Sequence, residues 1–226
     1  MARRNGTVAV LFDIDGTLIT TGGAGAVAWR RAFDGLYGIP ADIGEFTDAG
    51  MTDPEVGRLT FVNVIGREPT APELAELMAH RLTFLPDAVA QSKRYRVLAG
   101  VERQLQRLVH ARYLLGLTTG GVEEAARIKL ERAGLNRFFS FGGYGSDSPD
   151  RTELTKRAIQ RAASRHGRTL EPDRCAVVGD TPLDIAAAHG AGAVAVGVAS
   201  GHFSVQELRE AGADHVVVSL EEELPL

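Results

Sequence analysis

Four aspartates follow two short apolar runs of the sequence, at the points where buried strands are expected to end. Asp13 and Asp15 follow the first run of the chain, and Asp180 and Asp184 follow a later one. Carboxylates held close together resist joint ionisation, and a divalent cation relieves that cost. Oxygen ligands suit Mg²⁺, which also keeps substrate phosphate oxygens in its coordination shell. These aspartates therefore predict a metal-assisted site for phosphoryl transfer.

Hydroxyl and glycine residues follow a third apolar run. Thr118, Thr119 and Gly120 lie at the end of the run that begins at Tyr113. In an open α/β sheet, ligands bind beyond the carboxyl ends of the strands. Taken alone, the threonine segment and the Asp180 segment each also fit an ordinary helix cap. The convergence of three such segments on one sheet edge favours a functional site.

The elements that must position these residues alternate along the chain. Apolar, β-prone runs are separated by helical patterns, two of which end at Gly134 and Gly167. This alternation predicts a doubly wound parallel α/β sheet with helices on both faces. The expected strands are 7–12, 113–118, 175–178, 193–196 and 215–218, with a weaker candidate at 138–141, and the expected helices are 123–133, 152–166, 183–190 and 205–211.

The segment 21–95 breaks this alternation. It contains no strand-like run, and its helical stretches cover 24–37, 53–65 and 71–85. Prolines fall at or near the expected breaks, at Pro40, Pro54, Pro69, Pro72 and Pro86. The pattern predicts an all-helical cap domain at 21–95, inserted after the first strand into a core domain formed by 1–20 and 96–226.

Composition and charge narrow the class of protein. The 226 residues are 44% hydrophobic and 24% charged, which is typical of a globular chain, and the formal net charge is -4. That charge argues against a broad nucleic-acid surface, because such surfaces cluster Lys and Arg. The single cysteine, Cys175, is expected to be a buried thiol. With no secretory signal and no run of membrane-spanning length, we expect a cytoplasmic monomer or homodimer that binds neither nucleic acid nor membrane.

Two of these segments carry a family resemblance. The stretch Asp13-Ile-Asp-Gly-Thr-Leu18 resembles the first motif of the haloacid dehalogenase-like (HAD) phosphohydrolases, and Gly179-Asp-Thr-Pro-Leu-Asp184 resembles their fourth motif. Thr118 is similar to the hydroxyl residue of the second motif. The resemblance implies a Rossmann-like core with a helical cap. The segment Gly50-Met-Thr-Asp-Pro54 resembles a cap loop of phosphoglycolate phosphatase-like members.

The resemblance also implies a role for each acid. Asp13 is expected to attack phosphorus and form an aspartyl-phosphate. Asp15 is expected to protonate the leaving oxygen and then to activate water. The expected ligands of Mg²⁺ are the Asp13 and Asp180 carboxylates and the backbone carbonyl of Asp15, with Asp184 holding a metal-bound water or the loop.

The remaining site residues are expected to bind the substrate. Thr118 would hydrogen-bond a phosphate oxygen, next to Thr119, which stands where the family often has Asn. Backbone N–H groups near Gly16 and Gly120 would add donors. In the cap loop, Thr52 and Asp53 face substrate or cap the helix that follows.

The cation of the family's third motif is usually a lysine, and the sequence offers two candidates. Arg151 lies at a junction between a loop and a helix, and its guanidinium can bridge phosphate and carboxylate. Lys156, one turn inside the helix, is the alternative.

Together these residues predict a Mg²⁺-dependent phosphatase that hydrolyses a small phosphorylated metabolite, phosphoglycolate-like or a sugar phosphate, through phospho-Asp13. A phosphomutase of the same superfamily and a non-catalytic phosphometabolite-binding or scaffold protein are the alternatives. Product analysis separates the first alternative from a phosphatase, and metal-dependent turnover separates the second.

Overall fold

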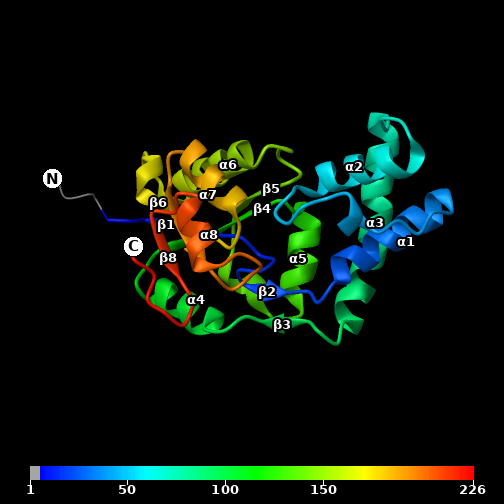
Figure 1. Cartoon of the computed structure of the whole chain (residues 1–226). Helices are drawn as coiled ribbons and strands as arrows, with labels where there is room; N and C mark the ends of the chain where they lie inside the picture. Colours follow the sequence, from blue (N-terminus) through cyan, green and yellow to red (C-terminus); the bar gives the residue numbers. More distant parts are fainter. Residues whose placement is uncertain (1–5) are drawn as a thin grey trace.

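The computed structural model describes residues 6–226. The first five residues of the predicted core segment 1–20, including the Arg3-Arg4 pair, lie outside the described residues. Figure 1 shows a part built on a central sheet and, beside it, a part made of helices α1, α2 and α3. Of the helices described, none is long and apolar enough to span a bilayer.

The central sheet has six strands in the order β5-β4-β1-β6-β7-β8, and every neighbouring pair is parallel. β1 lies between β4 and β6, so the strand before Asp13 and the strand before Asp180 are direct neighbours. The parallel α/β prediction is confirmed. The strands are β1 (Ala9–Phe12), β4 (Leu114–Thr119), β5 (Gly142–Tyr144), β6 (Cys175–Gly179), β7 (Val194–Val198) and β8 (His215–Val217).

Helices cover both faces of this sheet. Side chains of a strand alternate between its two faces, so each strand contributes apolar residues to both. Val10 and Phe12 of β1 pack in one apolar cluster with residues of α4 and α5, whereas Ala9 and Leu11 pack in another with residues of α6, α7 and α8. Cys175 is fully buried in the second cluster. These helices are α4 (Val101–His110), α5 (Glu123–Glu131), α6 (Arg151–His166), α7 (Pro182–Gly190) and α8 (Val205–Glu210).

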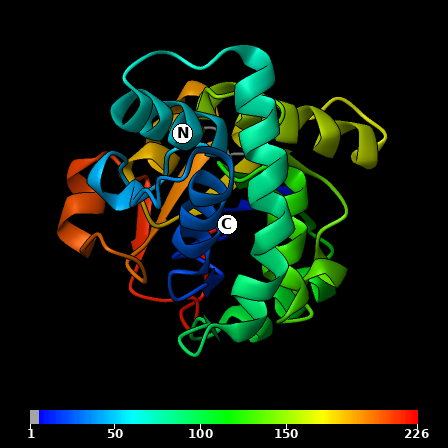
Figure 2. The ribbon, with the colours of Figure 1, turned by 90° about the vertical axis from the view of Figure 1, so that its right-hand side faces the viewer.

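The helical part consists of α1 (Ala24–Tyr37), α2 (Asp53–Ile65) and α3 (Ala71–Gln91). Figure 2 views the molecule from the side of this helical part and shows α1 and α3 next to each other. The chain enters this part after β2 (Ile19–Thr20) and leaves it before β3 (Arg96–Val97), and these two short strands pair antiparallel. The exact domain limits at 20/21 and 95/96 stay a prediction.

Two element predictions were wrong. The helix predicted to stop at Leu85 continues through Pro86 to Gln91, although proline leaves the Leu82 carbonyl without its helical donor. Burial of Leu85, Ala88 and Val89 against α1 and α5 offsets that loss.

The weak strand candidate at 138–141 is also misplaced. Phe138, the first residue of this candidate, is the last residue of a 3-10 helix, Leu135–Phe138. The strand that follows is Gly142–Tyr144. A Cβ atom on Gly143 would overlap the carbonyl oxygen of Leu154, so the glycine lets α6 approach β5 closely. Helix α4 and the β2–β3 pair were not predicted from the sequence.

Candidate active site

A cavity of about 430 Å³ opens between the carboxyl edge of the sheet and the helical part. Both parts contribute to its wall. Of the site residues predicted from the sequence, those lining it are Asp13, Asp15, Gly16, Asp53, Thr119, Gly120, Arg151 and Asp180. Thr52, Thr118 and Asp184 lie behind this wall.

Asp13 lies at the end of β1, where its backbone N–H donates to the Val178 carbonyl at 2.9 Å. Its carboxylate is buried. Burial raises the pKa of Asp13 well above its ordinary value, and the neighbouring Asp184 raises it further, although Arg151 opposes the shift. A second cation beside this carboxyl group would favour its ionised form.

Asp180 follows β6 on the adjacent strand. The Thr17 hydroxyl donates to its Oδ1 at 3.0 Å. Burial, and then the charge of Asp184, raise the pKa of Asp180 to about 7. Cβ atoms on Gly16 or Gly201 would overlap its carboxylate, so two glycine backbones enclose Asp180 closely.

Asp184 lies in the first turn of α7, behind Asp180. Its Oδ2 accepts from the backbone N–H of Thr181 at 3.1 Å and from the Thr181 hydroxyl at 2.8 Å. The Asp184 N–H donates back to the Thr181 hydroxyl oxygen at 3.3 Å, which completes a capping box. Its Oδ1 accepts from Arg151. Both oxygens therefore have protein partners, which agrees better with a supporting position than with direct metal ligation.

The carboxylates fit a divalent cation. Asp13, Asp180 and Asp184 each place one oxygen within 4.8 Å of the others, and all are buried. Hard divalent cations bind oxygen donors in proteins, and they offset the repulsion between neighbouring carboxylates.

Arg151 is the first residue of α6, and Asp150 caps that helix by accepting from the Thr152 N–H at 2.7 Å. The Arg151 Nη2 donates to Asp13 Oδ1 at 3.4 Å and to Asp184, and Nη1 donates to the Gly50 carbonyl at 2.8 Å. Lys156, in contrast, donates to Glu153 at 2.8 Å on the surface. Of the two candidates for the third-motif cation, Arg151 is the one beside Asp13.

The two threonines at the end of β4 point in opposite directions. Thr119 lines the cavity, whereas the Thr118 hydroxyl lies 2.9 Å from that of Thr155 on α6. The cause is the two-residue period of a strand, which sends consecutive side chains to opposite faces. The role expected of Thr118, to hold a phosphate oxygen, stays a prediction, and of the two residues Thr119 is the one on the cavity wall.

The loop before α2 is tied to the core. The Thr52 hydroxyl donates to the Pro149 carbonyl at 3.2 Å, and the Asp53 N–H donates to the Gly120 carbonyl at 2.8 Å. Asp53 Oδ2 also accepts from the Val122 N–H at 2.9 Å, at the start of α5. Thr52 therefore joins the two parts of the molecule, while Asp53 both joins them and lines the cavity.

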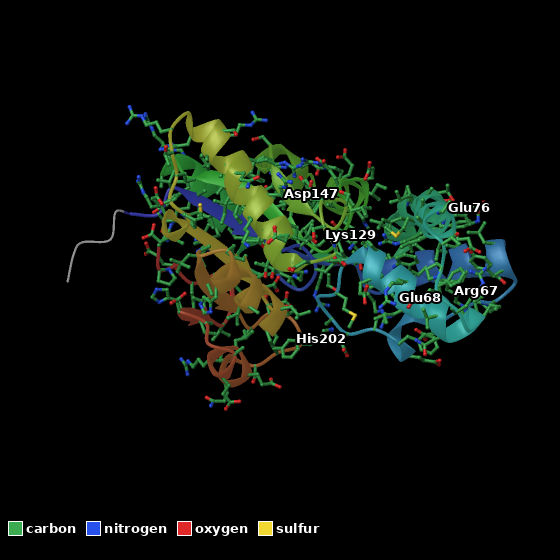
Figure 3. The ribbon with its side chains drawn as sticks, turned by 90° about the horizontal axis from the view of Figure 1, so that it is seen from above. Arg67, Glu68, Glu76, Lys129, Asp147 and His202 are labelled. Atoms are coloured by element: carbon green, nitrogen blue, oxygen red, sulfur yellow. The ribbon has the colours of Figure 1, made fainter. Side chains whose placement is uncertain are left out.

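Two buried cations of the cavity wall were missed in the sequence. Arg81 of α3 is 1% exposed, donates to Asp53 Oδ2 at 2.7 Å and stacks 4.7 Å above the ring of Trp29. Lys129 of α5 is buried and donates to Asp15 Oδ2 at 2.5 Å. Figure 3 shows Lys129 and His202, which both line the cavity, at the junction between the two parts. The sequence signal that could have found Lys129 is its spacing of four residues from the apolar Ala125. Residues four apart lie on the same face of a helix.

A doubly wound sheet with carboxylates beyond its strand ends, beneath a helical part that closes a cavity, defines an α/β enzyme core. The sequence model of the haloacid dehalogenase-like hydrolases matches residues 7–192. The chain therefore belongs to the haloacid dehalogenase-like hydrolase family, as its first and fourth motifs predicted.

Individual relatives cover nearly the whole chain. The probable phosphatase IndB of Dickeya dadantii (strain 3937) is 28% identical over 220 residues, which are 94% of this chain and 90% of that protein. A hydrolase from Pseudomonas syringae superposes with a TM-score of 0.69 at 26% identity, covering 95% of this chain and 94% of that one. A predicted phosphoglycolate phosphatase from Haemophilus somnus 129pt has a TM-score of 0.73 at 19% identity and covers 95% of both chains, which shows a shared fold.

Proposed function

We propose that this chain is a Mg²⁺-dependent phosphatase that hydrolyses a small phosphomonoester through a phosphoryl group carried on Asp13. The observation that carries the proposal is the setting of Asp13, a buried cavity-lining carboxylate between Asp180 and the Arg151 guanidinium. The naming of the 28% identical IndB protein as a probable phosphatase supports the same activity.

In the first half-reaction, a carboxylate oxygen of Asp13 attacks phosphorus and the bond from phosphorus to the ester oxygen breaks. The leaving oxygen takes the proton of the Asp15 carboxyl group. Arg151 and the Thr119 hydroxyl lie on the cavity wall, where they would hold phosphoryl oxygens as charge develops on them. An alcohol leaves, and Asp13 carries the phosphoryl group.

In the second half-reaction, water attacks phosphorus and gives its proton to the Asp15 carboxylate. The bond from phosphorus to Asp13 breaks, which regenerates the Asp13 carboxylate and releases inorganic phosphate. Mg²⁺ held by Asp13, Asp180 and the Asp15 backbone carbonyl, with Asp184 in support, would offset the repulsion between carboxylate and phosphate.

We propose residues 21–95 as the cap domain and 1–20 with 96–226 as the core. The cap loop contributes Asp53 to the cavity wall, and α3 contributes Arg81, so this domain would select the leaving group. A cavity of about 430 Å³ suits a small metabolite. The one buried thiol, Cys175, agrees with a cytoplasmic setting.

The test is phosphate release from a panel of small phosphomonoesters, including phosphoglycolate and sugar phosphates, with Mg²⁺ and with a chelator. The proposal predicts Mg²⁺-dependent release by the wild type and none by Asp13→Asn. Release that is unaffected by the chelator, or retained by Asp13→Asn, would count against it. Conversion of a sugar phosphate to its isomer without free phosphate would identify a phosphomutase instead.

A further inference from the structure

Lys129 and Asp15 form an ion pair inside the cavity. Lys129 Nζ donates to Asp15 Oδ2 at 2.5 Å, from a side chain that is 9% exposed, while the side chain of Asp15 is 44% exposed. The two residues are 114 positions apart and come from different elements. A buried ammonium without a partner is costly, so this contact fixes both side chains.

The backbone of Lys129 is held on several sides. The Tyr95 hydroxyl donates to the Lys129 carbonyl at 2.8 Å. Ala125 of the same helix packs against residues of α1 and α3, whereas Leu130 packs in the core cluster beneath the sheet. Helix α5 is therefore shared between the two parts, and the ammonium group projects from a rigid support.

The other acid near Lys129 already has its donors. A Cβ atom on Gly121 would lie 3.7 Å from Asp53 Oδ2 and 4.0 Å from Lys129 Nζ, so both groups border the same small region. Asp53 Oδ2 accepts from Arg81 and from the Val122 N–H, at 2.7 and 2.9 Å. Of these two acids, Asp15 is the one that accepts a hydrogen bond from Lys129.

We propose that Lys129 is a positioning residue for Asp15. It holds Oδ2 through a charge-assisted hydrogen bond, and Oδ1 accepts no hydrogen bond from the residues that the structure describes. Oδ1 is then the oxygen that gives its proton to the ester oxygen as the phosphorus–oxygen bond breaks, while Lys129 keeps its own protons. This inference rests on the proposed phosphatase activity.

The role predicts a dependence on the leaving group. An alkoxide needs the proton of Asp15 in order to leave, whereas 4-nitrophenolate leaves without one. Displacing a catalytic group by about 1 Å can cost on the order of 100-fold in rate. Loss of Lys129 should therefore slow the cleavage of alkyl phosphates and spare that of 4-nitrophenyl phosphate.

The experiment compares Lys129→Met and Lys129→Arg with the wild type on the best alkyl phosphate of the panel and on 4-nitrophenyl phosphate. The readout is kcat/KM, which reports phosphoryl transfer to Asp13, with kcat and KM recorded separately. Lys156→Met is the control, because Lys156 is an exposed lysine paired with Glu153. Thermal melting checks that each variant is folded.

We expect Lys129→Met to lose about 100-fold in kcat/KM with the alkyl phosphate and less than about 5-fold in kcat/KM with 4-nitrophenyl phosphate. Where the second half-reaction limits kcat, kcat should fall with both esters, because Asp15 activates water in that step. Lys129→Arg should recover most of the loss, and Lys156→Met should match the wild type. In an Asp15→Asn background, Lys129→Met should cost little more, because the group that it positions is gone.

Equal losses in kcat/KM on the two esters, or no loss on either, would overturn the role of Lys129 while leaving the phosphatase proposal intact. If Lys129→Met does not fold, Lys129→Gln decides, because it also lacks the ammonium group and must show the same dependence on leaving group. A wild type that releases phosphate from neither ester would instead overturn the proposed function, and this inference with it.

Discussion

The guanidinium of Arg151 lies 3.4 Å from Asp13 Oδ1, and its other contacts reach Asp184 and the carbonyl of Gly50 in the cap loop. One side chain thus joins the proposed nucleophile, the acid behind it and the helical part of the molecule. A lysine ammonium is a compact point charge that cannot span these three partners together.

Replacing Arg151 should therefore reduce turnover strongly. We expect Arg151→Met to lower kcat/KM by about 100-fold or more, and Arg151→Lys to recover only part of it. Phosphate release measures both effects. Lys156→Met is the matched control, and the assignment of the third-motif cation to Arg151 fails if that variant is the one that loses activity.

The stability of the metal-free protein should depend on the protonation of Asp180. Its pKa is raised to about 7 in the folded state, against about 3.9 for an unfolded aspartate. Between these values the folded state binds more protons than the unfolded state, so this group makes stability fall as pH rises from about 4 to about 7. Thermal melting in a chelator should show the fall, and Asp180→Asn should remove much of it.

Magnesium should reverse that trend, because it binds the ionised carboxylate in competition with the proton. The melting temperature should rise more on adding Mg²⁺ at pH 8 than at pH 5. An equal rise at both pH values would show that Asp180 does not take part in metal binding.

The buried pair between Arg81 and Asp53 should matter far more for stability than exposed pairs. Its side chains are 1% and 10% exposed, against 43% and 78% for Arg107 and Glu223. Removing one member of a buried pair leaves an uncompensated charge, at a cost of about 3 to 5 kcal/mol. Urea unfolding should show such a loss for Asp53→Ala and at most about 1 kcal/mol for Glu223→Ala. Similar losses for the two variants would contradict this reading of the pair.

Gly201 should be needed for metal binding, although it is not itself a ligand. A Cβ atom there would overlap Asp180 Oδ2, so Gly201→Ala must move the carboxylate. We expect the Mg²⁺ concentration for half-maximal phosphate release to rise by about 10-fold or more, as is typical when a ligand loses its support. Gly6→Ala, where no atom lies within 4 Å of the added Cβ, is the control. An unchanged Mg²⁺ requirement would place the metal away from Asp180.

The sequence was most informative where chemistry follows directly on a strand. The apolar runs before Asp13 and Asp180 end at those acids, and the sheet places the two strands side by side. It was less informative where one residue of register decides the outcome. Thr118 and Thr119 are chemically alike, and the strand geometry selects which of them reaches the cavity.

Contacts between distant elements were beyond the sequence. The pairing of Lys129 with Asp15 spans 114 positions, and that of Arg81 with Asp53 depends on how α3 packs beside α2. Helix α3 passes Pro86 because tertiary burial outweighs local propensity, which no local pattern reveals. These cases share one cause, since each depends on packing between segments far apart in the chain.

The central claim is that Asp13 carries the phosphoryl group during turnover. The most direct measurement is rapid acid quenching of the enzyme with Mg²⁺ and a ³²P-labelled ester substrate, followed by peptide mapping. The account predicts label that is released by hydroxylamine, on the peptide that contains Asp13, and no label on Asp13→Asn. Phosphate release by the wild type without any label on that peptide would contradict it.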